Sequence, residues 1–214
     1  MSAHCHHDHD DHSHGHHHAT GDPSAPGYRK VLWIALAVNA LMFAIEIAAG
    51  LRSGSVSLLA DAIDFFGDAA NYAVTLAVLS LAAVWRARAA LVKAVSMLAF
   101  GCFVLGKTVW AATQGVAPEA LTMGVVGAMA LAANLGVAGL LYAWREGDAN
   151  MRGVWLCTRN DAIGNVAVML AALGVFGTGT PWPDLGVAAV MAGLALSAGW
   201  SVFGQARKEL ARGT

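Results

Sequence analysis

The feature of this sequence that most limits its fold is a series of six long apolar segments. Crossing a hydrocarbon core of about 30 Å takes roughly 20 mostly apolar helical residues, and lipid forces backbone polar groups to pair within each segment. The chain is 57% apolar and only 13% charged, which excludes a soluble enzyme, a disordered regulator and a nucleic-acid binder with a basic face. We therefore predict an all-α membrane protein with six transmembrane helices at about 31–50, 56–84, 90–112, 120–144, 154–177 and 183–203.

The breaks between these segments carry polar, glycine or proline residues typical of turns. They lie at 52–55, 85–88, 113–119, 145–152 and 177–184. The order of segments predicts a cytoplasmic tail and linker at 1–30, a transmembrane domain at 31–205 and a short cytoplasmic tail at 206–214.

The basic residues predict the orientation, because cytoplasmic loops are enriched in Lys and Arg. With the N-terminus in the cytoplasm, only Arg52 and Lys107 fall near the outer face. We therefore expect both termini to be cytoplasmic. The opening residues do not have the pattern of a signal peptide. The cationic residues expected on or near the inside are Arg29, Lys30, Arg86, Arg88, Lys93, Arg145, Arg152, Arg207, Lys208 and Arg212.

Residues 1–18 are rich in possible metal ligands. They hold all nine histidines of the chain together with Cys5 and three aspartates. Neutral imidazole and thiolate bind zinc-like ions, so we predict a metal-chelating tail. The alternatives are a solubilising tail or an expression tag, and interruption by Asp, Ser, Gly and Cys argues against a tag. The chelating residues would be His4, His6, His7, His9, His12, His14, His16, His17 and His18.

The second predicted span contains three carboxylates, which are expensive in a membrane and indicate function. Asp64, Asp68 and Asn71 are spaced i, i+4 and i+7, on one helical face. Asp61 lies seven residues before Asp68, near the same face, unless it is a helix-end or water-facing acid. Acids on one stripe repel each other, so they need a cation, protons or water to coexist.

The fifth predicted span repeats this spacing with Cys157 and Asp161. Because the second span runs inward and the fifth outward, both residue pairs reach the central zone. Two antiparallel helices that each supply a pair one turn apart can build a four-coordinate metal site. The predicted ligands are Asp64, Asp68, Asp161 and Cys157.

Other polar residues in the spans have two interpretations. Cys157 is either a ligand or a small packing residue, and Cys102 is predicted to be a packing residue. Asn165, which follows Asp161 on its helix, is a further candidate ligand. Asn165 and Asn71 would serve equally well as interhelical hydrogen-bond formers.

The first span carries Asn39 and Glu46, seven residues apart and on one face. Glu46, a further candidate ligand, either lines the same water-filled path or pairs with Lys107 or Arg159. Arg159 lies between the two candidate ligands of the fifth span and would neutralise surplus acid or snorkel inward.

The run GLRSGSVSLLADAIDFFGD and the run CTRNDAIGN resemble the second-span and fifth-span motifs of the cation diffusion facilitator family. The resemblance covers roughly 31–205. It places Asp64 and Asp68 at the family's ligand pair and Asp161 at the acid of the second pair. Cys157 stands where the family commonly has histidine. Asn39 and Glu46 fit positions common in the family's first span.

The resemblance implies a divalent metal/proton antiporter that exports zinc or similar ions from the cytoplasm. Such a protein is usually a homodimer, and we expect it in a bacterial inner membrane. It implies no enzyme activity and no resident cofactor, only transported zinc or, alternatively, cadmium, cobalt or manganese. The given sequence ends about ten residues after the sixth predicted span, which predicts a short form without the family's usual cytoplasmic domain.

The residues themselves predict how such a site would work. Crowded acids hold protons when no metal is bound, and a divalent cation displaces them because metal ligands must be deprotonated. A metal-sensing or metal-storing membrane protein and a metal uptake permease remain alternatives. An intramembrane hydrolase is disfavoured because the spans contain no histidine.

Overall fold

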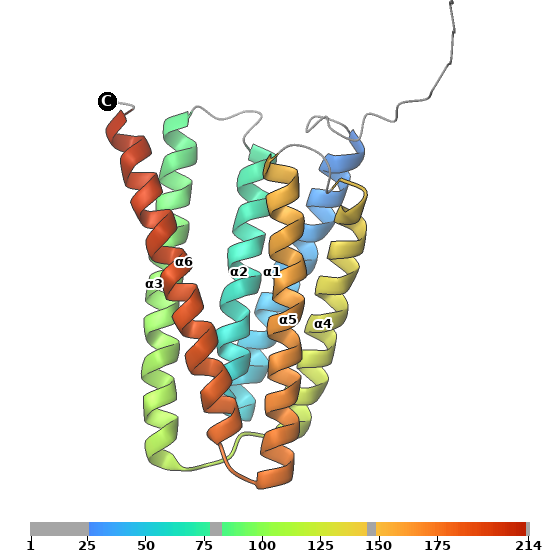
Figure 1. The fold of residues 1–214 in the computed structure, drawn as a ribbon, viewed down its shortest axis with the longest axis vertical. Helices are drawn as coiled ribbons and strands as arrows, with labels where there is room; N and C mark the ends of the chain where they lie inside the picture. The colour runs from blue at the N-terminus through green and yellow to red at the C-terminus, as the bar shows by residue number, and fades with distance from the viewer. Residues whose placement is uncertain (1–25, 78–82, 145–148, 213–214) are drawn as a thin grey trace, which may run out of the picture.

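In the computed structural model, the described part of this chain forms six α-helices, each antiparallel to the next (Figure 1). The structure describes residues 26–77, 83–144 and 149–212, without the side chains of 26, 83–87, 149–157, 159, 160, 209 and 212. The first helix starts and the last helix ends at the same end of the bundle. The helices are α1 (Pro26–Ser53), α2 (Val56–Ala77), α3 (Ala83–Gln114), α4 (Ala120–Tyr142), α5 (Ala149–Thr178) and α6 (Trp182–Arg212).

The three connections at the opposite end of the bundle are short and turn on glycine. Gly54, Gly115 and Gly179 each follow a helix end with a φ of 76°, 65° and 63°. This left-handed conformation costs glycine little and closes a helix C-terminus. The N–H of Gly115 donates to Ala111 at 3.1 Å, and that of Gly179 to Val175 at 2.8 Å. The breaks predicted at 52–55, 113–119 and 177–184 are confirmed in position, and the observed connections are shorter, at 54–55, 115–119 and 179–181.

The predicted helix boundaries at the end of the bundle that bears the two termini need correction. The second span was expected to reach residue 84, but residues 83–88 belong to α3 (Ala83–Gln114). The described part of α2 ends at Ala77, and 78–82 lie outside the described residues. Alanine and arginine are good helix formers, so a charged boundary does not end the helix. For the same reason α5 starts at Ala149, inside the break predicted at 145–152, and α6 continues to Arg212.

The helices pack closely in the pairs α1–α2, α4–α5 and α3–α6, and α2 contacts every other helix. The α3–α6 pair lies along one side of the bundle (Figure 1). Small residues allow this approach: a Cβ on Gly101 would lie 2.7 Å from Leu196, and one on Gly199 would lie 3.2 Å from Leu98. Close contact through small residues is typical of membrane helices.

Five of the described helices (α1, α3, α4, α5 and α6) are long and apolar enough to cross a membrane. The helix left out is α2, because Asp61, Asp64 and Asp68 interrupt its apolar sequence. Its 22 residues measure about 33 Å along the helix axis, and most of its first three turns is buried against its neighbours. The chain is thus a multi-pass membrane protein whose most acidic helix lies inside the bundle.

Candidate metal site

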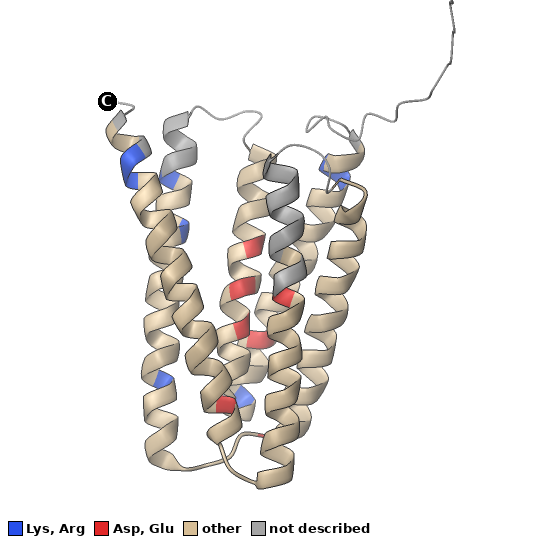
Figure 2. Ribbon diagram, in the orientation of Figure 1, with Lys and Arg blue, Asp and Glu red and all other residues tan. Residues whose placement is uncertain are grey.

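The acids predicted from the sequence collect inside the bundle. Figure 2 shows most described Asp and Glu residues around the middle of the bundle, whereas most Lys and Arg residues lie toward its ends. Asp61 and Asp68 on α2 and Glu46 on α1 are buried, while Asp64 on α2 and Asp161 on α5 are partly exposed. Apolar helices therefore surround an acidic interior.

Asp64 and Asp161 line one cavity of about 470 Å³. Helices α2, α3, α5 and α6 form its walls, which include the side chains of Met97 and Met191. Almost all the remaining lining is apolar, so the two carboxyl groups are its charged features. The structure therefore brings together the acids that the sequence placed on two separate spans.

Asp68 lies on the same side of α2, and its carboxyl group lies near that of Asp161. The Tyr72 hydroxyl donates to Asp68 Oδ2 at 3.2 Å and lies 2.7 Å from Thr158 Oγ1. A phenol has one proton, so Thr158 donates to Tyr72 when Tyr72 donates to Asp68. This chain of hydrogen bonds orients the Asp68 carboxylate.

Sequence reasoning missed Tyr72 and Thr158, although a signal was present. Tyr72 lies four residues after Asp68, and Thr158 lies three residues before Asp161. Both spacings place the hydroxyls on the helix faces that carry the acids. Both residues are buried, as expected of hydroxyls that support a polar site.

The complete ligand set is not assembled by the described side chains. Among these, no three His, Cys, Asp or Glu residues lie close enough together to hold one metal ion. Cys157 belongs to α5, but its side chain lies outside the described residues, as do the histidines of the 1–18 tail. The assignment of Asp64, Asp68, Asp161 and Cys157 as ligands stays a prediction.

A second polar group lies deeper in the bundle. Glu46 on α1 and Asp61 on α2 lie near each other, and both are buried. Their four carboxyl oxygens and the amide atoms of buried Asn165 have no hydrogen-bond partner within the described part of the chain. Buried polar groups without partners are costly, so this region needs protons, water or a cation.

The predicted partners of Glu46 are not seen. Its lack of any hydrogen-bonded partner among the described side chains contradicts the pairing with Lys107, and the side chain of Arg159 is outside the described set. Asn39 bonds within its own helix, with Nδ2 donating to the Ala35 carbonyl at 2.8 Å. The interpretation of Glu46 as part of an internal polar path therefore remains.

The predictions for Asn71 and Cys102 have different outcomes. Lys93 Nζ on α3 donates to Asn71 Oδ1, which confirms the prediction of an interhelical hydrogen bond. Lys93 also lies near Asp68, so a cation borders the acidic stripe. Cys102 is exposed on α3, so its prediction as a packing residue is wrong.

A side chain in the first turn of α6 forms hydrogen bonds with the start of α2. Asp184 is buried and accepts hydrogen bonds from Ser55 Oγ at 2.7 Å, Val56 N–H at 2.8 Å and Ser57 N–H at 3.0 Å. It therefore caps a helix that is distant in the sequence. Because α2 and α6 both line the cavity, this cap fixes two of its walls relative to each other. No local signal in the sequence predicts it.

Comparison with known proteins identifies a family and several relatives. The cation efflux transmembrane domain matches residues 32–211. The chain is 25% identical, over 202 residues, to the cadmium, cobalt and zinc/H(+)-K(+) antiporter of Bacillus velezensis, covering 87% of this chain and 64% of that protein. It is 24% identical, over 177 residues, to the metal cation efflux system protein CzcD of Cupriavidus metallidurans, covering 77% of this chain and 56% of that protein. The chain thus matches somewhat more than half the length of these relatives.

Proposed function

The chain belongs to the cation efflux family, also known as the cation diffusion facilitators, and we propose that it exports divalent metal cations in exchange for protons. We place the transport site between α2 and α5. Its proposed ligands are Asp64, Asp68, Asp161 and Cys157, with Asp61, Asn165 and Glu46 along the inner path. The proposed cargo is zinc or a similar ion such as cadmium, cobalt or manganese.

The observation that carries this proposal is the cavity shared by Asp64 and Asp161. A carboxylate from each of two antiparallel helices meets the basic requirement of a bundle metal site. Asp68 adds a third oxygen ligand next to Asp161. Cys157, one turn before Asp161, would add a thiolate, which favours zinc and cadmium over harder ions.

Exchange follows from the chemistry of these ligands. Without metal, several carboxyl groups in one enclosed space hold protons, since their negative charges repel each other. An arriving divalent ion replaces those protons because it binds the deprotonated groups. Release of the ion on the other side restores the protonated state. Helices that rock about the site would expose it to each side in turn.

We further propose that α2 also crosses the membrane, which gives six spans with the five named above, and that both termini are cytoplasmic. Burial of α2 among the other helices would shield its acids from lipid. The described cations at the end that bears the termini include Arg29 and Lys30 on α1 and Arg207 and Lys208 on α6, as the positive-inside rule requires. The membrane would be a bacterial inner membrane, and the working unit a homodimer.

The names of the relatives support the proposed substrates. The Bacillus velezensis relative is named a cadmium, cobalt and zinc/H(+)-K(+) antiporter. The two relatives named CzcD are described as cation efflux system proteins. The His-rich tail would raise the local metal concentration at the cytoplasmic entrance. No chemical transformation of a substrate is proposed, only its translocation.

The test is metal transport by the purified chain in proteoliposomes with an imposed pH gradient. We expect zinc and cadmium to move against a proton flux, and an Asp161→Asn variant to insert normally but not transport. Glu119→Gln, which changes an exposed acid outside the cavity, is the matched control. Metal binding without flux would favour a storage or sensing protein. Flux that runs only with the proton gradient, toward the proposed cytoplasmic face, would favour an uptake permease.

A further inference from the structure

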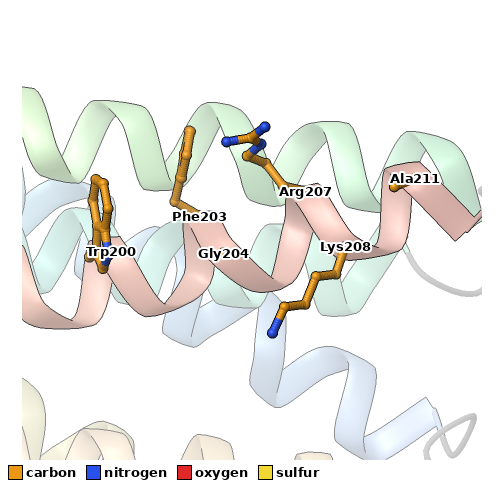
Figure 3. Close-up of a pocket in the computed structure, with 6 residues that line it drawn as sticks. All are labelled: Trp200, Phe203, Gly204, Arg207, Lys208 and Ala211. Atoms are coloured by element: carbon orange, nitrogen blue, oxygen red, sulfur yellow. The ribbon is translucent and has the colours of Figure 1, made fainter.

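The cytoplasmic half of α6 carries a shallow groove of about 390 Å³ that lies away from the metal cavity (Figure 3). Its lining residues recur every three or four positions, so they form one stripe along the helix. Figure 3 shows the Phe203 and Arg207 side chains on one flank of α6 and Lys208 on the other. The lining residues are Trp200, Phe203, Gly204, Arg207, Lys208 and Ala211.

Two tryptophans fix the depth of this groove in the membrane. Trp182 and Trp200 are 67% and 68% exposed and lie about 27 Å apart along the helix axis. This spacing is close to the hydrocarbon thickness of about 30 Å, and exposed Trp residues concentrate at the two membrane interfaces. Arg207 and Lys208 lie roughly 10–12 Å beyond Trp200, at the level of the lipid headgroups.

Neither cation of the groove has an acidic partner among the side chains that the structure describes. None of the six lining residues is acidic, and neither Arg207 nor Lys208 forms an ion pair with a side chain that the structure describes. The Arg207 guanidinium lies 5.8 Å from the centre of the Phe203 ring, which stacks on Trp200 at 5.9 Å. This cation–π contact holds the guanidinium in place and leaves its N–H groups able to bind an anion.

The floor of the groove is open. A Cβ on Gly204 would meet nothing within 4 Å, so this position leaves room for a ligand.

We propose that this groove binds the headgroup of an anionic phospholipid. Arg207 would bind the lipid phosphate with two N–H groups, and Lys208 would contribute a point charge. Trp200 and Phe203 would lie beside the glycerol and the upper acyl chains. Basic pockets on the cytoplasmic face of membrane proteins suit such headgroups. The proposal depends on the membrane placement of α6 and is independent of whether the chain transports metal.

The test uses the full-length purified chain in phosphatidylcholine bilayers with and without 20 mole per cent phosphatidylglycerol, chosen as the anionic probe. Native mass spectrometry counts the phosphatidylglycerol molecules retained after release from the bilayer. We expect Arg207→Gln and Lys208→Gln each to weaken retention about fivefold, as expected for the loss of one interfacial charge. Gly204→Leu should weaken it by filling the groove without changing any charge. Lys30→Gln, at an exposed cation on α1 at the same end, is the matched control and should retain the lipid.

Equal losses in Lys30→Gln and in the groove variants would overturn the proposal, since a general surface field would then explain the binding. Wild-type retention in both charge variants would overturn it as well. So would a change in oligomer size without a change in lipid, because a second copy of the chain would then occupy the groove. Thermal melting of each variant separates loss of lipid from loss of fold, and Arg207→Lys, which keeps the charge, should retain more lipid than Arg207→Gln.

Discussion

Removal of the Asp184 carboxylate should loosen the bundle at the end opposite the termini. The proposed change is Asp184→Ala. It deletes the acceptor of three hydrogen bonds, from Ser55 Oγ at 2.7 Å and the backbone N–H groups of Val56 and Ser57 at 2.8 and 3.0 Å. It thereby removes a cap from α2 and a direct tie between α2 and α6.

The size of the effect follows from these bonds. A hydrogen bond to a charged group contributes about 1.5–3 kcal/mol, and loss of a helix cap alone costs about 0.5–2 kcal/mol. The three bonds share one carboxylate, and water can reach donors at a helix end once the side chain is gone. We therefore expect a net loss of about 2–4 kcal/mol in the free energy of unfolding. For a chain of this size this corresponds to a fall of roughly 5–15 °C in melting temperature.

The assay is thermal unfolding of the purified protein in detergent, followed by the fluorescence of an introduced thiol probe or by loss of soluble monodisperse protein. Asp184→Asn keeps an acceptor oxygen and should fall between the wild type and Asp184→Ala. Glu119→Ala removes an exposed acid at the same end of the bundle, which accepts one bond from Thr122 Oγ1 at 2.8 Å, and should change the melting temperature little. A melting temperature for Asp184→Ala equal to that of Glu119→Ala would refute the reasoning.

Three further predictions concern the transport site. Tyr72→Phe removes the donor to Asp68 and should raise the metal concentration for half-maximal transport about three- to tenfold, with normal insertion; an unchanged value would mean that Asp68 needs no orientation. Cys157→Ser should lower the cadmium transport rate more than the manganese rate, since the thiolate is the soft ligand, and an unchanged rate ratio would remove Cys157 from the site. Deletion of residues 1–18 should keep transport at saturating metal and weaken it at low metal. Loss of transport at saturating metal in that variant would show that the tail is part of the transport machinery.

Much of the fold follows from apolar segment length and turn chemistry. The glycine connections after α1, α3 and α5 were predictable, because each pairs a polar break with a residue that takes a positive φ. The helix starts at the end of the bundle that bears the termini were not predictable, because Arg and Ala continue a helix beyond its apolar core. This is why residues 85–88 belong to α3 instead of a loop.

Part of the candidate site was likewise predictable from the sequence, and part was not. Spacing predicted that Asp64 and Asp161 lie on the inward faces of their helices, and they share a cavity. Spacing within one helix cannot predict which distant residues meet, so the tie between Asp184 and the start of α2 was missed. The exposure of Cys102 was missed for a related reason: in a membrane protein an apolar position can face lipid as readily as the core.

Equilibrium cadmium binding tests whether α2 and α5 bind the same ion. Calorimetric titration would use the chain without residues 1–18, so that tail chelators do not contribute, and would compare Asp64→Asn, Asp161→Asn and the double variant. We predict one site, weakened at least roughly 100-fold by either change, which is more than the loss of an outer-shell partner produces. The double variant should be little worse than either single one, since both residues serve one ion. Unchanged affinity in either single variant, or independent and additive losses, would contradict a shared site.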